Sequence, residues 1–187
     1  MLLTGSMDGS VRTWDLRTRV HTSLSVHAEA KDAVLDVAAA PTFWVSSSTD
    51  GSVRLYDLKA GKLRISRLPD AVSGLRLSDN AAALLCGGND DAVRMLDTST
   101  GNCLNTYRGH TAGGLKQSVA FAGSDSSILA TDARGRIYEW DLVSAQVIAN
   151  RQISPTLAAI TDIDISPTNA HMAAITSLDG QIYLEDW

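Results

Sequence analysis

The stretch that decides the fold is Asp50-Gly51-Ser52-Val53-Arg54-Leu55-Tyr56-Asp57, because the chain repeats it. Residues 8–15 match it at six of eight positions, and residues 90–97 keep the same frame with Leu96 in the aromatic position. Residues 134–141 and 179–186 are two further copies. A recurrence every 40 to 45 residues indicates a repeat architecture. The aspartates that close the copies are Asp15, Asp57, Asp97, Asp141 and Asp186.

Each repeat has the local signals of short antiparallel strands. Apolar and β-branched runs such as residues 33–37 and 53–56 are short, and no segment keeps a helical period. The Asp-Gly pairs at residues 8–9, 50–51 and 179–180 separate two such runs, which predicts two-residue hairpins of type I′.

Consecutive four-stranded units at this period are the blades of a β-propeller. We therefore predict an all-β fold, a single propeller segment over residues 1–187 with about four and a half blades. Three strands precede three complete four-stranded units, and three strands follow them. The predicted units are residues 1–27 (partial), 28–68, 69–109, 110–154 and 155–187 (partial).

Composition narrows the functional class. Residues 1–67 carry nine basic and seven acidic side chains, residues 68–187 carry seven and fourteen, and no basic run indicates direct nucleic-acid binding. No apolar run is long enough to predict a membrane span. Cys86 and Cys103 fall on the second and fourth strands of one predicted unit, too far apart for a disulfide, so both thiols are expected to be free.

At these residues the chain resembles the WD-repeat family, whose pattern includes Gly-His, a turn Asp and a closing Trp-Asp. The order of the closing variants at residues 56–58, 94–97 and 138–143 is more narrowly similar to one group of kinase scaffolds within that family. The resemblance implies a seven-bladed ring that acts as a scaffold for mitogen-activated protein kinase cascades in the cytoplasm. It also implies a component found with the spliceosome in the nucleus.

In the WD-repeat pattern the turn Asp accepts a hydrogen bond from a His, which links to a strand Ser or Thr and to the Trp. No repeat here holds all four residues, and Arg134 stands where the fourth turn Asp belongs. We therefore expect apolar packing between blades to supply most of the stability. The structural signature residues are Asp8, Trp14, Asp15, His27, Asp50, Tyr56, Asp57, Asp90, Asp97, His110, Trp140, Asp141, Asp179 and Asp186.

Arg12, Arg54 and Arg94 recur at one frame position, which predicts a structural ion pair, with the closing Asp of a neighbouring strand as the expected partner. Residues beside the turn Asp are the best candidates for partner binding, since such side chains emerge on one rim of a propeller. These rim candidates are Met7, Thr49, Asn89, Ala133 and Leu178.

No catalytic residues, metal ligands or cofactors are predicted, because the Ser, His and Asp residues recur as copies of one structural frame. The carboxylates Asp36, Asp162 and Asp164 on predicted innermost strands leave open a channel-bound metal. Residues 109–116 nearly match a phosphate loop, but Gln117 stands where Ser or Thr is needed, so a Gly-rich connection is favoured.

The leading hypothesis is a non-catalytic scaffold that binds other proteins, in kinase-cascade signalling, in pre-mRNA splicing or in both, and that is cytoplasmic and nuclear. The alternatives are an RNA-processing component that contacts RNA directly and an enzyme with a channel metal. Seven blades need about 280 residues, so we expect the chain to be a fragment of a longer propeller, with self-association possible if the ring is open.

Overall fold

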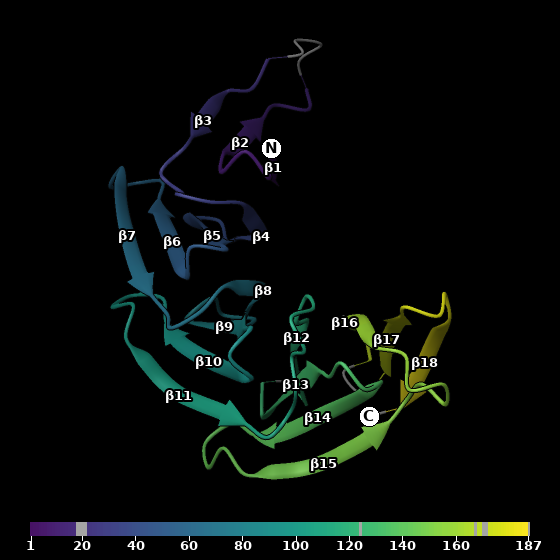
Figure 1. The fold of residues 1–187 in the computed structure, drawn as a ribbon. Helices are drawn as coiled ribbons and strands as arrows, with labels where there is room; N and C mark the ends of the chain where they lie inside the picture. Colours follow the sequence, from purple (N-terminus) through teal and green to yellow (C-terminus); the bar gives the residue numbers. More distant parts are fainter. Residues whose placement is uncertain (18–21, 124, 167, 170–171, 187) are drawn as a thin grey trace.

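The computed structural model describes residues 1–17, 22–123, 125–166, 168–169 and 172–186, and these residues form strands and turns with no helix. The strands make five antiparallel sheets arranged as an arc around a common centre (Figure 1). The all-β prediction and the partial propeller are therefore confirmed.

Sheets are numbered along the chain. Sheet 1 contains β1 (Leu2–Gly5), β2 (Val11–Trp14) and β3 (Ser25–His27). Sheet 2 contains β4 (Val34–Ala39), β5 (Phe43–Ser48), β6 (Ser52–Asp57) and β7 (Lys62–Arg67). Sheet 3 contains β8 (Val72–Leu77), β9 (Ala83–Gly88), β10 (Ala92–Asp97) and β11 (Cys103–Arg108). Sheet 4 contains β12 (Val119–Ala122), β13 (Ser127–Thr131), β14 (Arg136–Asp141) and β15 (Val147–Gln152). Sheet 5 contains β16 (Ile160–Ile165), β17 (Met172–Ser177) and β18 (Ile182–Asp186).

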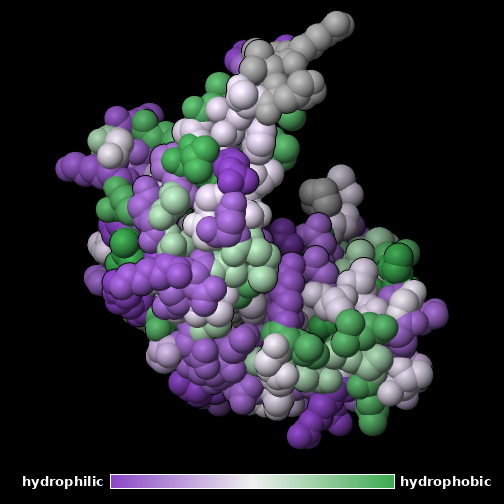
Figure 2. Space-filling model, turned by 45° about the horizontal axis from the view of Figure 1, so that its top comes forward, coloured by the Kyte–Doolittle hydropathy of each residue, from purple (hydrophilic) through white to green (hydrophobic). Residues whose placement is uncertain are grey.

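Within each sheet the strands lie in sequence order, so β4, β8, β12 and β16 face the centre of the arc while β7, β11 and β15 form its outer edge (Figure 1). A space-filling view shows a hollow on one side of the arc, between the arm formed by the first sheets and the rest of the molecule (Figure 2).

The core lies between the sheets rather than inside any of them. In β9, Leu84 and Cys86 pack against sheet 2, whereas Leu85, one residue away, packs against sheet 4. Successive side chains of a strand point to opposite faces, and both faces of this strand are covered. The same packing buries Trp44 between sheets 1 and 2 and Trp140 between sheets 3 and 4.

The hairpins between the second and third strands differ from the predicted type. A type I′ turn needs positive φ at both central residues. Of the central pair Asp50 and Gly51 in sheet 2, only Gly51 has positive φ, 74°, and its N–H donates to the Ser48 carbonyl at 3.1 Å. This hydrogen bond closes a four-residue turn whose last residue is left-handed, the geometry of a three-residue hairpin with a bulge. A left-handed residue is therefore still needed at this position, and in sheet 3 it is Asp91, with φ 56°. Asp50 serves a different purpose.

Candidate functional site

The hairpins just described lie at one end of the strands, which we call the turn rim. The closing aspartates lie at the opposite end, which we call the closing rim. In sheets 1 to 3 the turn Asp forms an ion pair with the Arg four residues later. Arg54 Nη2 lies 2.6 Å from Asp50 Oδ2, and the Arg54 side chain is 3% exposed. The prediction of structural pairing is correct, but the expected partner, a closing Asp, is wrong.

The Asp50 carboxylate also organises the backbone. It accepts the N–H of Ser52 at 2.9 Å and the N–H of Lys31, in the connection from sheet 1, at 3.0 Å. Burial alone would raise the pKa of Asp50, but Arg54 and these backbone donors outweigh it and hold the pKa well below its usual range. Each turn Asp of this kind therefore fixes a hairpin, and Asp50 also joins two sheets.

Sheet 4 performs the same task with a residue that the sequence analysis missed. Arg134 occupies the turn-Asp position, but Asp132, two residues earlier and 3% exposed, accepts the N–H of Arg134 at 2.5 Å. Asp132 also accepts the N–H of Thr111, in the connection from sheet 3, at 2.9 Å. The sequence did offer a signal: Asp132 is an acidic residue two positions before the turn-Asp position. Sheet 2 has Ser48 at the equivalent place.

The two described signature histidines have different positions. His27 pairs with Val11 in the same register as Tyr107 with Val93, so it belongs to the outer strand of sheet 1. Its Nε2 lies 3.1 Å from Ser25 Oγ. In the family pattern a His donates a hydrogen bond to the turn Asp, but in sheet 2 Arg54 is the side chain that donates to Asp50.

His110 is buried in the connection between sheets 3 and 4. Its Nε2 lies 2.6 Å from Gln117 Oε1, and its ring meets Trp140 edge-on at 5.3 Å. Gln117, also missed by the sequence analysis, donates to the Thr131 carbonyl at 2.9 Å. Burial lowers the pKa of His110, although the Gln117 bond acts in the opposite sense. This group is therefore a neutral structural network.

The aromatic and closing signature residues also make internal bonds. The Trp14 indole donates to Thr4 Oγ1 at 3.0 Å, and the Tyr56 hydroxyl donates to Glu29 at 3.0 Å. Asp57 accepts the N–H groups of Lys59 and Ala60 in the turn that follows it. Similar turn bonds are made by Asp15, Asp97 and Asp141, while Asp179 accepts the hydroxyl of Thr156 and Asp186 offers its carbonyl to Arg151.

The structure brings two of the five rim candidates together. Thr49 and Asn89 line a cleft of about 330 Å³ on the turn rim. Its other walls are Leu35, Ala71, Ser73, Gly114, Leu115 and Lys116. Met7 and Leu178 lie elsewhere on the rim, 81% and 63% exposed. Ala133 is partly buried, and its N–H donates to the Thr111 carbonyl at 2.9 Å.

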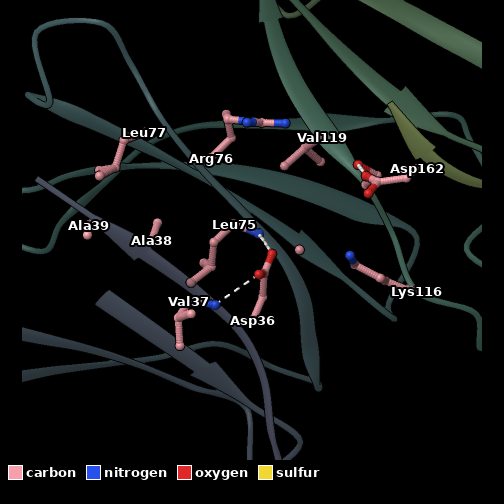
Figure 3. Close-up of a pocket in the computed structure, with 12 residues that line it drawn as sticks. Asp36, Val37, Ala38, Ala39, Leu75, Arg76, Leu77, Lys116, Val119 and Asp162 are labelled. Atoms are coloured by element: carbon pink, nitrogen blue, oxygen red, sulfur yellow. Dashed lines mark hydrogen bonds between the residues drawn. The ribbon is translucent and has the colours of Figure 1, made fainter. Parts of the chain in front are cut away.

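A second pocket, of about 420 Å³, lies on the innermost strands and shares Lys116 with the cleft (Figure 3). Asp36 points between β4 and β8, where it accepts the N–H groups of Val37 at 2.8 Å and Leu75 at 2.9 Å. Asp162 accepts the Ser118 hydroxyl at 2.5 Å. These predicted channel carboxylates therefore join neighbouring sheets.

Asp164, the third innermost-strand carboxylate, forms an ion pair of 2.8 Å with Arg76. Among the residues that the structure describes, no three His, Cys, Asp or Glu side chains gather closely enough to hold a metal ion. The described chain also has no helix capable of crossing a membrane. Cys86 is buried, Cys103 is exposed, and both are free thiols, as predicted.

Comparisons with known proteins agree with this geometry. The family model for the WD domain, G-beta repeat, matches residues 1–15 and 18–57. An uncharacterized WD repeat-containing protein of Schizosaccharomyces pombe is 30% identical over 152 residues, which cover 81% of this chain and 51% of that protein. WD repeat domain-containing protein 83 of Rattus norvegicus is 29% identical over 119 residues, 64% of this chain and 38% of that protein.

The same protein of Danio rerio is 29% identical over 122 residues, 65% of this chain and 38% of that protein. The narrower resemblance that the closing variants indicated is thus confirmed at modest identity. The chain spans about half, or less, of the length of these curated relatives.

Proposed function

Because this chain is a WD-repeat protein with the fold of a partial β-propeller, we propose that it is a non-catalytic scaffold that binds other proteins through its turn rim. WD-repeat proteins generally act as scaffolds for protein–protein interaction. The proposal assigns recognition to the cleft around Leu115 and Lys116 and gives the repeated polar residues a structural role.

The observation that carries the proposal is that the signature residues bond within the molecule, whereas Leu115 and Lys116 of the cleft face solvent. Turn aspartates, their arginines and the closing aspartates are engaged in bonds within the molecule. The cleft instead exposes the apolar side chains of Leu35 and Leu115 to solvent, beside the Lys116 ammonium, which is also exposed. An apolar surface with a few polar groups is suited to binding a protein segment.

The cellular context of the proposal is a kinase-cascade assembly in the cytoplasm, a splicing assembly in the nucleus, or both. Its support is the similarity to WD repeat domain-containing protein 83 and the order of closing variants at residues 56–58, 94–97 and 138–143. The partners in this proposal are proteins rather than RNA, since residues 68–187 carry twice as many acidic as basic side chains.

The test is affinity capture from lysate with the immobilised chain and two cleft variants, Leu115→Asp and Lys116→Glu. Ile148→Asp is the matched control, because Ile148 is 58% exposed on the outer strand β15. We expect the wild type and the control to retain the same proteins after nuclease treatment and both cleft variants to lose them. Equal recovery by all four folded proteins would refute the assignment to the cleft, and loss on nuclease treatment would favour RNA contact.

A further inference from the structure

We call the boundary between neighbouring sheets at the closing rim a seam, and in sheets 2, 3 and 4 the outer strand reaches across it to the next sheet. At the seam between sheets 2 and 3, Arg64 Nη1 donates to the Thr98 carbonyl at 2.8 Å and Ser66 Oγ to the Gly101 carbonyl at 3.1 Å. The Arg64 stem lies against Gly101, where an added Cβ would meet its Cδ at 3.1 Å. The cavity left at this seam is about 10 Å³.

Two further seams are closed from the register positions of Arg64 and Ser66, the last of them from the Ser66 position alone. Asn105 and Tyr107 of β11 donate to the Leu142 carbonyl at 3.2 and 2.7 Å. Arg151 of β15 donates to the Asp186 carbonyl at 2.9 Å. A long outer-strand side chain that donates to a turn carbonyl of the next sheet is therefore the common means of closing a seam.

The seam between sheets 1 and 2 lacks this closure. Ser25 pairs with Thr13 as Arg64 pairs with Leu55, so Ser25 occupies the Arg64 position. Its short hydroxyl lies 2.7 Å from Thr13 Oγ1 and does not reach the next sheet. The result is a pocket of about 380 Å³. Its walls include Ser25, His27, Trp44, Tyr56, Leu58 and Gly61, which correspond to Arg64, Ser66, Leu84, Leu96, Thr98 and Gly101 at the closed seam.

The lining of the open pocket is chemically suited to an arginine side chain, which Arg64 supplies at the neighbouring closed seam. Leu58 and Gly61 occupy the positions whose carbonyls accept hydrogen bonds at the closed seam. The charged side chains of the lining are the acids Glu29 and Asp57 and the base Lys62, so the acids outnumber the base. His27 adds an aromatic edge beside the stacked rings of Trp44 and Tyr56. Turn carbonyls, carboxylates and aromatic rings together favour a planar cation with several N–H donors.

We propose that the seam between sheets 1 and 2 is a binding site for an arginine side chain of a partner protein. The guanidinium takes the place that Arg64 takes one sheet later, with its donors directed to the Leu58 carbonyl and its stem over Gly61. The site lies on the closing rim, opposite the cleft around Lys116, and does not depend on the function proposed for that cleft.

The test is NMR titration of the chain with acetylated and amidated Gly-Arg-Gly, and with the citrulline peptide, its neutral isostere, as control. A single side chain in an open pocket binds at about millimolar Kd. We expect saturable shifts of the Trp44 indole and the Gly61 amide, and binding about tenfold weaker for citrulline. Ser25→Arg should fill the pocket from within the chain and abolish the shifts.

Three further variants keep the test independent of any single substitution. Glu29→Gln keeps an acceptor for Tyr56 but removes a carboxylate, and should weaken the arginine peptide several-fold. Arg64→Ser should open the equivalent pocket and add a second set of shifts at Gly101. Lys116→Glu should leave the titration unchanged, which separates this site from the cleft. Equal binding of the citrulline peptide, undiminished binding by Ser25→Arg, or no saturable shift at all would overturn the proposal.

Discussion

The hairpins of sheets 2 and 4 do the same structural work with different residues. In sheet 2, Asp50 accepts the turn N–H of Ser52 and the inter-sheet N–H of Lys31, and its charge is matched by Arg54. In sheet 4, Asp132 stands two positions earlier and accepts the inter-sheet N–H of Thr111, the counterpart of Lys31, and the N–H of Arg134, whose counterpart in sheet 2 is Asp50. The difference teaches that the inter-sheet donor keeps its position, while the acid that serves it, and the hairpin N–H bound by that acid, move by two positions.

The side chains around the two acids differ accordingly. Tyr138 replaces the arginine in sheet 4, and its ring stacks on Trp140 at 5.7 Å near His110. Sheet 2 therefore neutralises its acid with a buried ion pair, whereas sheet 4 adds the neutral His110–Gln117 network beside its acid. The comparison predicts that the two hairpins respond differently to charge removal and to pH.

The largest effect is expected from Arg54→Leu. This change leaves the mostly buried Asp50 carboxylate without its countercharge, and breaking a buried pair from one side costs about 3 kcal/mol or more. Chemical denaturation should show this loss, with a smaller loss for Arg54→Lys, which keeps the charge. Similar unfolding midpoints for Arg54→Leu and the wild type would show that the ion pair does not stabilise the fold.

The next effect is expected from Asp132→Ala. The substitution removes the acceptor of two part-buried backbone N–H groups, those of Arg134 and Thr111. A donor left unsatisfied away from water costs about 1–3 kcal/mol, and the exposed Arg134 should contribute less than Thr111. Asp132→Asn keeps an acceptor oxygen and should recover part of the loss in the same denaturation experiment. An unchanged free energy of unfolding in Asp132→Ala would contradict the role assigned to this residue.

A smaller, pH-dependent effect is expected at His110. Because burial holds its pKa below the ordinary value of 6.5, the unfolded chain binds a proton that the folded chain resists. The stability contributed by neutral His110 is therefore present above pH 6.5 and is lost as the pH falls towards the folded pKa. Thermal melts from pH 7.5 to about 5 should fall more steeply for the wild type than for His110→Gln; parallel curves would argue against this titration.

The smallest effect is expected from Arg12→Leu in sheet 1. Arg12 makes the same pair as Arg54, with Nη2 at 2.8 Å from Asp8, but its side chain is 36% exposed and that of Asp8 is 49% exposed. Water and salt screen such a pair. The variant should melt close to the wild type, and its difference should vanish in high salt. A loss as large as that of Arg54→Leu would mean that burial does not set the strength of these pairs.

The sequence was sufficient to predict the strand order, the positions of the hairpins but not their turn type, and the structural pairing of the recurrent arginines, since these follow from residues repeated at a fixed period. It could not identify Arg54's partner, because the closing and turn aspartates are both close to it along the chain. Asp132 and Gln117 were missed because each stands outside the repeated frame, and only the fold places them against Thr111 and His110.

The pockets depended even more on three-dimensional information. Thr49 and Asn89 were expected on the rim, but Lys116 and Leu115 join them only through the connection between sheets 3 and 4. The open seam is invisible in the sequence until the register places Ser25 and His27 at the positions of Arg64 and Ser66, from which the other seams are closed.

The most direct test of the shared role of Asp50 and Asp132 is amide hydrogen exchange measured by NMR at two inter-sheet donors. We expect the amides of Lys31 and Thr111 to be protected in the wild type. Asp50→Ala should expose Lys31 and leave Thr111 protected, and Asp132→Ala should do the reverse, with the core amides of β13 unchanged in both. Exchange of Lys31 and Thr111 at the same rates in all three proteins would contradict the claim that a displaced acid serves the same inter-sheet donor position.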